Sequence, residues 1–262
     1  MKKSQIAAQI YCFRDFLQTE RGIADTFRRL HRMGYEAVQL TASLPESVTP
    51  EKLLKLLADH GLKAVSSHES GAKIFNETDR IIEKLQALGV KHLAYPAPHI
   101  CPTGVGEVID LAEKLNALAL KFKEYGITLA YHNHHIEFRR FEGKMMLDLI
   151  YEHAPDLQGE IDTHWVQRGG GNPLSWIERL AGRMEVIHLK DYGVDSADIK
   201  SIWSNQPVMK PVGSGNLDWD AIIPAAERSG VKVFVVEHDK DVPDPFASFA
   251  QSFAFLAEKF CR

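Results

Sequence analysis

A recurring pattern of hydrophobic and polar positions runs through the chain: an amphipathic segment, a glycine, a few further residues, and then a short apolar run. Residues 106–125 illustrate the first part, because Val108, Leu111, Ala112 and Leu115 recur there at helical spacing. A glycine directly after a helix adopts the left-handed conformation that ends it, so each copy of the pattern indicates a helix-to-strand connection. Six such glycines are present: Gly34, Gly61, Gly89, Gly126, Gly182 and Gly230.

The apolar runs after these glycines have the length and composition of buried strands. Two more strands are predicted without such a glycine, one over residues 6–11 and one around residues 158–165. Eight short strands that alternate with helices indicate a parallel sheet, and a chain of 262 residues suits a closed barrel. We therefore predict an α/β fold, a single (β/α)₈ TIM barrel with parallel strands, as one domain over residues 1–262. An open doubly wound sheet is the alternative, but the glycine-rich nucleotide motifs usual in that fold follow none of the predicted strands.

Composition narrows the class of partner. The formal net charge is −4 and the Lys and Arg residues are dispersed, which argues against a nucleic-acid surface. We expect no membrane partner, because no segment approaches the roughly 20 apolar residues of a membrane span and the N-terminus lacks the apolar core of a signal peptide. Three widely spaced cysteines favour a reduced, cytoplasmic protein in which they serve as packing residues. The expected partner is a small sugar-like molecule, and homo-oligomerisation is left open.

Residues with catalytic or metal-binding chemistry concentrate at the ends of the predicted strands, where the active sites of such barrels lie. In chain order they are His68, His132, His134, Glu137, Asp162, His164, Trp165, His188, Lys190 and Glu237. Because alternate residues of a strand share a face, we expect three pairs of these to point the same way. The pairs are His132 with His134, Asp162 with His164, and His188 with Lys190.

Four successive strands then present imidazole, carboxylate, imidazole and carboxylate around one axis. The candidate metal ligands are His132, Asp162, His188 and Glu237. A mixed nitrogen and oxygen set suits one divalent ion such as Mn²⁺, Zn²⁺, Co²⁺ or Mg²⁺. Each residue also has a simpler interpretation, since Asp162 alone fits a helix cap and Glu237 alone fits a solvated loop. The coincidence of four at equivalent positions favours the metal site.

The remaining candidates receive other roles. Lys190 is expected to be catalytic, because a buried ammonium without an anionic or metal-bound partner is costly. The expected substrate-binding residues are His68, His134, His164 and Trp165. The glycines of PVGSGNLDW fit either a phosphate-binding loop or a turn before a helix, and we favour the turn.

These residues resemble the xylose isomerase-like TIM barrels, a superfamily that contains sugar phosphate isomerases and epimerases, apurinic endonucleases and inosose enzymes. The resemblance runs almost end to end. It is carried by AQIYCFRD, GYEAVQL, GLKAVSSH, GITLAYHNHHIEF, EIDTHWVQRGG, VIHLKD, VGSGNLDW and FVVEHD. Within the superfamily, the chain resembles the sub-branch marked by YHNHxxEF.

The resemblance also implies a ligand set with one departure. Ketose epimerases of this superfamily bind metal through Glu, Asp, His and Glu, and the last three correspond to Asp162, His188 and Glu237. The first Glu corresponds to His132. In those epimerases both glutamates also move protons, so a symmetrical epimerase mechanism is in doubt, and Glu137 or His134 is the candidate for the missing group or ligand. Two formal ligand charges in place of three leave the ion more Lewis acidity, which favours polarising a substrate carbonyl.

The function that the resemblance implies is an enzyme of carbohydrate metabolism: a divalent-metal-dependent isomerase or epimerase of a sugar or sugar phosphate. It would transfer a proton α to a carbonyl through a metal-stabilised enediolate, with Glu237, Glu137 or a histidine moving the proton. A lyase or hydratase acting on a keto-sugar or inosose would use the same residues. An apurinic endonuclease is less favoured, because it needs a trinuclear zinc site and a basic groove. A non-catalytic sugar-binding barrel is supported only by the missing first glutamate.

Overall fold

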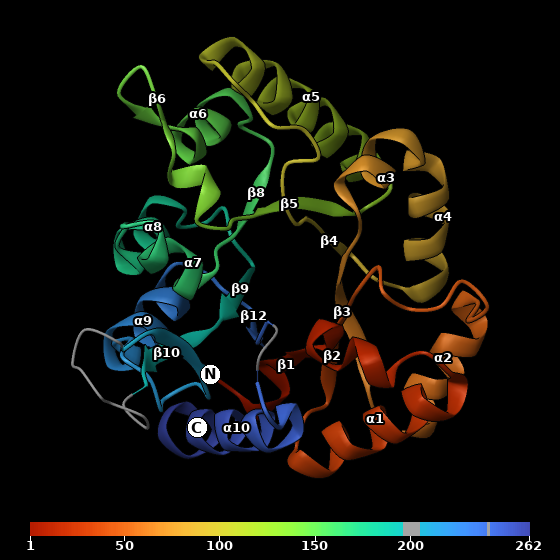
Figure 1. Cartoon of the computed structure of the whole chain (residues 1–262). Coiled ribbons are helices and arrows are strands. Elements are labelled where there is room, and N and C mark those ends of the chain that lie inside the picture. Colours follow the sequence, from red (N-terminus) through yellow and green to blue (C-terminus); the bar gives the residue numbers. More distant parts are fainter. Residues whose placement is uncertain (196–204, 240–241) are drawn as a thin grey trace.

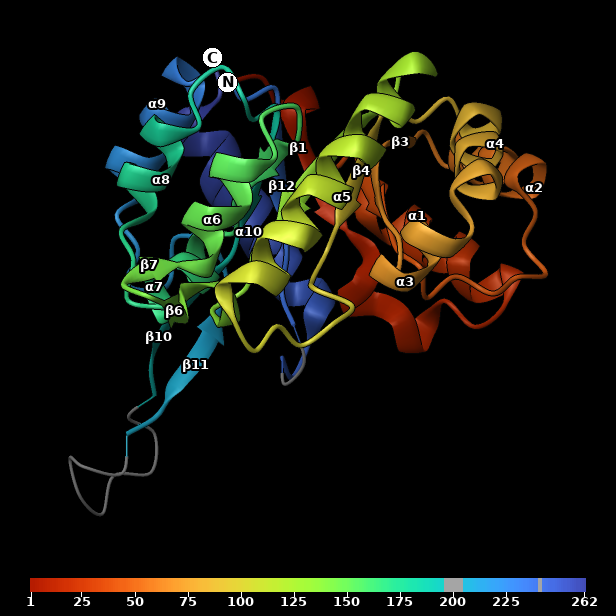
Figure 2. The same ribbon diagram turned by 90° about the horizontal axis from the view of Figure 1, so that it is seen from above.

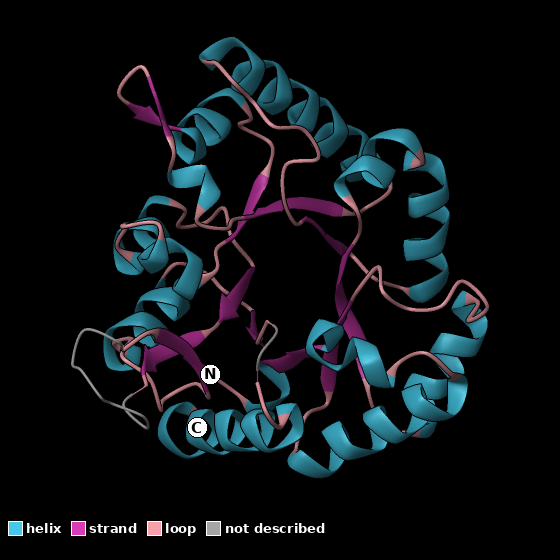
Figure 3. Ribbon diagram, viewed as in Figure 1, coloured by secondary structure: helices cyan, strands magenta, loops and turns pink. Residues whose placement is uncertain are grey.

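The computed structural model describes residues 1–195, 205–239 and 242–262, and its strands form a ring enclosed by helices (Figures 1 and 3). The ring is one eight-stranded sheet in which all paired strands are parallel. In order around the ring the strands are β8 (Gln158–Glu160), β5 (Thr128–His132), β4 (His92–Tyr95), β3 (Lys63–His68), β2 (Ala37–Leu40), β1 (Ile6–Gln9), β12 (Val233–Val236) and β9 (Val186–Leu189). A single parallel bridge between Asp162 and His188 joins β8 to β9 and nearly closes the barrel. The predicted (β/α)₈ TIM barrel is confirmed.

The helices pack their apolar faces against the outside of the strands. They are α1 (Glu20–Met33), α2 (Pro50–Asp59), α3 (Gly71–Asn76), α4 (Thr78–Leu88), α5 (Val105–Glu124), α6 (Met146–His153), α7 (Thr163–Arg168), α8 (Pro173–Arg179), α9 (Trp219–Arg228) and α10 (Pro245–Phe260). All six predicted connection glycines have positive φ, between 66° and 108°. Side chains with a Cβ rarely adopt this conformation, which explains why glycine recurs at these helix ends.

Two predicted strands are shorter than expected, and the difference changes where side chains point. The first ends at Gln9, after which a 3₁₀ helix, η2 (Ile10–Phe16), begins. The strand expected around residues 158–165 ends at Glu160, and α7 follows. Asp162 caps α7, because its carboxylate accepts a hydrogen bond from the Trp165 backbone N–H at 2.9 Å. The expectation that Asp162 and His164 share a strand face is therefore wrong, since His164 lies on the helix.

In the described part of the chain, two antiparallel ribbons and short 3₁₀ helices lie outside the eight-stranded barrel. The antiparallel ribbon of β10 (Asp191–Val194) and β11 (Pro207–Lys210) projects from one end of it (Figure 2). A shorter ribbon joins β6 (Arg140–Phe141) to β7 (Lys144–Met145), and the short 3₁₀ helices η1 (Lys3–Gln5) and η3 (Ile136–Phe138) complete the elements. The three cysteines are free thiols, and Cys101 is exposed, so the expectation that all three serve as packing residues is wrong for it. Among the described helices, none combines the length and the apolar character needed to cross a membrane.

Candidate metal centre

The four candidate ligands from the sequence converge at the C-terminal ends of four neighbouring strands. His132 is the last residue of β5, His188 lies in β9, and Asp162 and Glu237 follow β8 and β12. All four side chains are buried, and one potential ligand atom from each lies within 4.8 Å of the others. The bridge between Asp162 and His188 aligns two of them directly. The fold thus brings together the residues that the strand-end pattern selected.

The ring of His188 is held in one orientation by partners on both sides. Its Nδ1 lies 2.7 Å from Glu237 Oε2 and its Nε2 lies 2.6 Å from Gln39 Oε1. The Gln39 amide donates from Nε2 to Ser66 Oγ and to Glu160 Oε2, both at 2.9 Å, which leaves its Oε1 as the acceptor for His188. In the neutral tautomer with hydrogen on Nε2, Nδ1 therefore directs its lone pair towards the carboxylates.

Glu160 is a central residue of the site that the sequence analysis missed. Its carboxylate lies 2.5 Å from His68 Nε2, 3.0 Å from His188 Nε2 and 3.6 Å from His132 Nδ1. A second compact group of potential ligands consists of His68, His132, Glu160 and His188. Strand alternation was the available signal, because Glu160 precedes Asp162 by two residues and so shares its face. Glu160 lies within the predicted strand, whereas the candidate residues were those that follow each apolar run.

Lys190 lies fully buried among three carboxylates. Its Nζ is 3.1 Å from Asp162 Oδ2, 3.0 Å from Glu237 Oε2 and 3.1 Å from Asp239 Oδ1. Burial alone would lower the pKa of Lys190, but these carboxylates outweigh it and raise that pKa above its usual range, so the ammonium stays charged. The anionic partner that the sequence analysis required for this lysine is therefore present.

The buried charges around the ligand group do not balance. Four carboxylates, those of Glu160, Asp162, Glu237 and Asp239, face the Lys190 ammonium and the His188 imidazole. Burial lowers the pKa of His188, but Glu160 and Glu237 outweigh that effect and raise it to about 10. Even with both His188 and the His68 imidazole beside Glu160 protonated, four negative charges against three positive ones leave an excess of negative charge. Burial raises the pKa of Asp162 to about 6 against the opposing effect of Lys190, as expected for a site short of positive charge.

Unsatisfied polar atoms in this group also fit a bound cation. His132 Nδ1 is buried and has no hydrogen-bond partner among the described residues, and the buried Asp162 Oδ2 has only its ion-pair contacts with Lys190 and His188 there. Burial, and then the nearby His188, hold the pKa of His132 well below its usual range, so its imidazole is neutral and retains a free lone pair. Buried polar atoms without partners are rare, and a metal ion that binds them removes the cost. The residues present therefore fit a divalent ion.

A cavity of about 290 Å³ opens over the ligand group. Its lining includes His132 and Glu237 of the group together with His68 and His134. His134 follows the end of β5, and its ring lies 5.1 Å from that of His132. Burial lowers the pKa of His134 to about 4, so the imidazole is neutral. His68 and His134, both expected to bind substrate, thus border the same space as the candidate ligands.

Glu137 takes a different position from the other candidates. Its buried carboxylate accepts hydrogen bonds from Tyr131 Oη at 3.0 Å and from the His134 backbone N–H at 2.8 Å. Burial raises the pKa of Glu137 to about 7. It is not among the residues that line the cavity over the ligands. The carboxylate therefore holds the turn that carries His134.

His164 and Trp165 line a second cavity of about 570 Å³. It shares Tyr11 and Asp239 with the cavity over the ligands, so the two cavities are neighbours at the barrel mouth. Trp165 connects them, because its ring lies 5.2 Å from that of His134. All four expected substrate-binding residues therefore border one or the other of these cavities.

The glycine-rich loop after β11 is a turn, as the sequence analysis favoured. The backbone N–H groups of Gly213 and Gly215 each donate to Asp191 Oδ2 at 3.0 Å, and Trp219 Nε1 donates to the same oxygen at 2.7 Å. These donors are occupied by a carboxylate of the chain itself. The interpretation as a phosphate-binding loop is therefore not supported.

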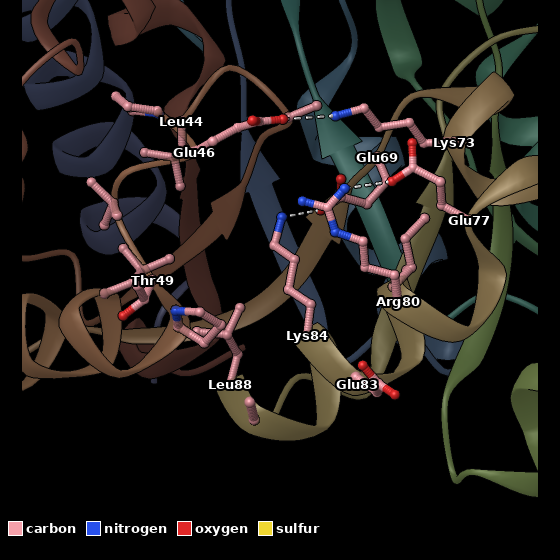
Figure 4. A pocket seen from close by; sticks show the side chains of 17 residues that line it. Leu44, Glu46, Thr49, Glu69, Lys73, Glu77, Arg80, Glu83, Lys84 and Leu88 are labelled. Carbon is pink, nitrogen blue, oxygen red and sulfur yellow. Dashed lines mark hydrogen bonds and ion pairs between the residues drawn. The ribbon is translucent and has the colours of Figure 1, made fainter.

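A third cavity, of about 420 Å³, lies on the outside of the barrel between α2 and α4 (Figure 4). Figure 4 shows its charged side chains joined in pairs, with Lys84 on Glu69 at 2.6 Å and Arg80 on Glu77 at 2.8 Å. The lining also includes Glu83, but none of these carboxylates belongs to either compact group of potential metal ligands found in the described part of the chain. We therefore assign the candidate site to the mouth.

The fold and the site define a (β/α)₈ barrel with a candidate divalent-metal centre at its C-terminal mouth. Residues 27–259 match the family model described as xylose isomerase-like TIM barrel. The chain belongs to that family, as the resemblance predicted, while membership of the YHNHxxEF sub-branch stays a prediction. Comparison with curated proteins gives no match.

Several solved structures share the fold at low sequence identity. A sugar phosphate isomerase/epimerase from Parabacteroides distasonis is 20% identical with a TM-score of 0.79, over 99% of this chain and 95% of that one. A probable 3-DHS dehydratase from Bacillus anthracis is 15% identical with a TM-score of 0.74, over 99% and 100%. A xylose isomerase-like TIM barrel protein from Mycobacterium smegmatis, in complex with magnesium, is 16% identical with a TM-score of 0.73, over 98% and 97%. At these identities the likeness establishes the fold alone.

Proposed function

We propose that the protein is a divalent-metal-dependent isomerase or epimerase that moves a proton α to the carbonyl of a sugar or sugar phosphate. The observation that carries the proposal is the convergence of four buried ligand-type side chains in a cluster with excess negative charge. The family and the printed descriptions of the structural neighbours, an isomerase/epimerase and a magnesium complex, support the same class.

The residues that would hold the ion are His132, Asp162, Glu237 and the Nδ1 atom of His188. When bound, a divalent ion supplies Lewis acidity that polarises a carbonyl oxygen. Glu160 and Gln39 accept or share the hydrogen on His188 Nε2 and so orient the ring from the opposite side. Lys190 holds Asp162 and Glu237 through its ammonium, which supports a positioning role.

Two residues of the cavity have the chemistry to move a proton. Glu237 borders the cavity, and although burial opposes it, Lys190 and His188 hold its pKa well below the usual range, so it is an ionised base. His134 borders the same cavity with a neutral imidazole whose buried Nδ1 lacks a partner within the described part of the chain. This geometry favours His134 over Glu137 as the residue that takes the role of the missing first glutamate. The Glu137 carboxylate instead accepts a hydrogen bond from the His134 backbone N–H.

A lyase or dehydratase is the second candidate, and one observation favours it. The cavity next to the ligand group is lined by His164, a buried imidazole whose unpaired N–H could hydrogen-bond a departing hydroxyl group. One of the structural neighbours carries the description of a probable dehydratase. Glu237 would abstract the same proton in both reactions, and only the fate of the substituent at the β-carbon would differ.

The first test is metal dependence of the fold. An ion that binds only the native state adds about 2.7 kcal/mol at a free concentration 100 times its Kd. That corresponds to a rise in Tm of roughly 5–10 °C for a chain of this size. We expect EDTA to lower the Tm and Mn²⁺, Co²⁺ or Zn²⁺ to raise it. Asp162→Asn is the matched variant, because Asn still caps α7 but removes a ligand charge, so it should lose the shift.

The second test follows the proton. Ketoses and aldoses incubated with the metal-loaded protein in D₂O should exchange hydrogen for deuterium at the carbon α to the carbonyl, as detected by NMR. An isomerase or epimerase leaves exchanged sugar, whereas a lyase releases a new product. A Tm that responds to neither EDTA nor any of the three ions, with no exchange into any sugar, would contradict the proposal.

A further inference from the structure

The second cavity at the barrel mouth has features of a ligand site that the proposed proton transfer does not use. Its lining includes Tyr11, His164, Trp165, Arg168, Tyr192, Met209 and Asp239. Tyr192 and Met209 come from β10 and β11, the ribbon that projects from the barrel (Figure 2). Because Tyr11 and Asp239 border both cavities, a ligand can extend from the candidate metal centre into this space.

Unpartnered polar atoms line this cavity. His164 is only 1% exposed, yet neither of its ring nitrogens has a hydrogen-bond partner among residues 1–195, 205–239 and 242–262. Trp165 Nε1 is also buried without a partner there. A neutral imidazole offers one donor and one acceptor. Leaving three such groups unpaired is costly, and ligand hydroxyl groups would satisfy them.

The aromatic rings and unpaired polar atoms of the lining favour a ring with hydroxyl groups. The rings of Trp165 and Tyr192 each lie 4.8 Å from that of His164, so aromatic surface surrounds the polar atoms. Aromatic faces pack well against the C–H face of a sugar ring while its hydroxyls form hydrogen bonds. Arg168 and Asp239 both line this cavity, so its charged groups do not select an anion, and an apolar ring would leave His164 unsatisfied.

We propose that the substrate is a two-ring sugar. Its reacting keto or aldo unit occupies the cavity over the candidate metal centre, and a second hydroxylated ring, joined by a glycosidic bond, occupies the His164 cavity. The two cavities, of about 290 and 570 Å³, are each large enough for one ring. This inference rests on the proposed function, because it assigns the first cavity to the reacting sugar.

The experiment compares one monosaccharide with disaccharides that contain it. Fructose, maltulose and lactulose are titrated calorimetrically into the protein loaded with Zn²⁺, and saturation-transfer NMR reports which ring contacts the protein. We expect maltulose or lactulose to bind at least tenfold more tightly than fructose, with saturation of both rings. Met209→Trp fills the second cavity and should abolish the tenfold advantage. Val194→Trp is the matched control, since Val194 is exposed on the same ribbon and does not line the cavity.

Two of the possible outcomes separate this inference from the proposed function. Fructose binding with no disaccharide advantage would overturn the second ring site and leave the proposed function intact. Tighter binding of fructose 6-phosphate that is lost in Met209→Trp would also overturn it, because the cavity would then hold an anion. No binding of any sugar by the Zn²⁺-loaded protein would count against both. The Zn²⁺-dependent rise in Tm must persist in both tryptophan variants, which establishes that they fold.

Discussion

Two layers inside the barrel have opposite chemistry although they lie on the same strands. The lower layer is a separate buried apolar cluster made of Ala7, Ala37, Val186 and Val235. Two residues further along the same four strands, towards the mouth, come Gln9, Gln39, His188 and Glu237, which are all buried and polar. Because alternate residues of a strand share a face, both sets point into the barrel.

The difference between the layers shows how the barrel separates stability from chemistry. Burial of the apolar layer stabilises the fold and needs no partner. Burial of the polar layer costs free energy unless every group is paired, and the hydrogen bonds that link Gln9, Gln39 and His188 offset part of that cost. The excess negative charge around Glu237 would be balanced by a bound cation. If the two layers have separate roles, substitutions in the polar layer should change metal binding or turnover, and those in the apolar layer should mainly change the free energy of unfolding.

The largest effect is expected from Glu237→Gln in the polar layer. The substitution keeps the shape of the side chain but removes its charge and basicity. If Glu237 is both ligand and base, the variant should still bind metal when metal is in excess, while kcat falls by about 10²-fold or more. Recovery of turnover by excess metal would restrict Glu237 to a ligand role. Full activity at limiting metal would contradict both roles.

A smaller effect, on metal affinity, is expected from Glu160→Gln. Glu160 contacts the Nε2 atom of His188, whereas Nδ1 is the atom that would bind the ion. Loss of such a supporting carboxylate typically weakens metal binding about 10–100-fold. Competition with a fluorescent chelator measures this affinity without any assay of turnover. Glu152→Gln is the matched control, because Glu152 lies in α6 and pairs only with Lys144 among the described residues. An unchanged affinity in Glu160→Gln would remove Glu160 from the site.

The smallest effect on the site is expected from Val235→Ala, two residues before Glu237. The lost methyl groups and the resulting cavity should lower the free energy of unfolding by roughly 1–2 kcal/mol. Metal affinity should change less than about threefold, because Val235 offers no ligand atom, although its backbone pairs with that of His188. Chemical denaturation gives the first quantity and chelator competition the second. A tenfold loss of metal affinity would show that the two layers are coupled.

The sequence alone was sufficient to predict the architecture and to select the main group of candidate ligands. The connection glycines and the amphipathic segments are local signals, because helix termination and strand burial depend on neighbouring residues. Once the strands were known, the rule that barrel sites lie at the C-terminal strand ends selected His132, Asp162, His188 and Glu237. Each of these steps uses a short stretch of chain and a general property of the fold.

Only the tertiary structure decided how the surrounding side chains are arranged. Strand alternation stops where a strand stops, so the cap that Asp162 forms on α7 sends His164 into the second cavity. Glu137 turns away because Tyr131 and the His134 backbone hold its carboxylate. Glu160 becomes central because closure of the barrel brings β3, β5 and β9 around it. These contacts join residues far apart in the chain, and their energies depend on burial and distance, which no local pattern of residues specifies.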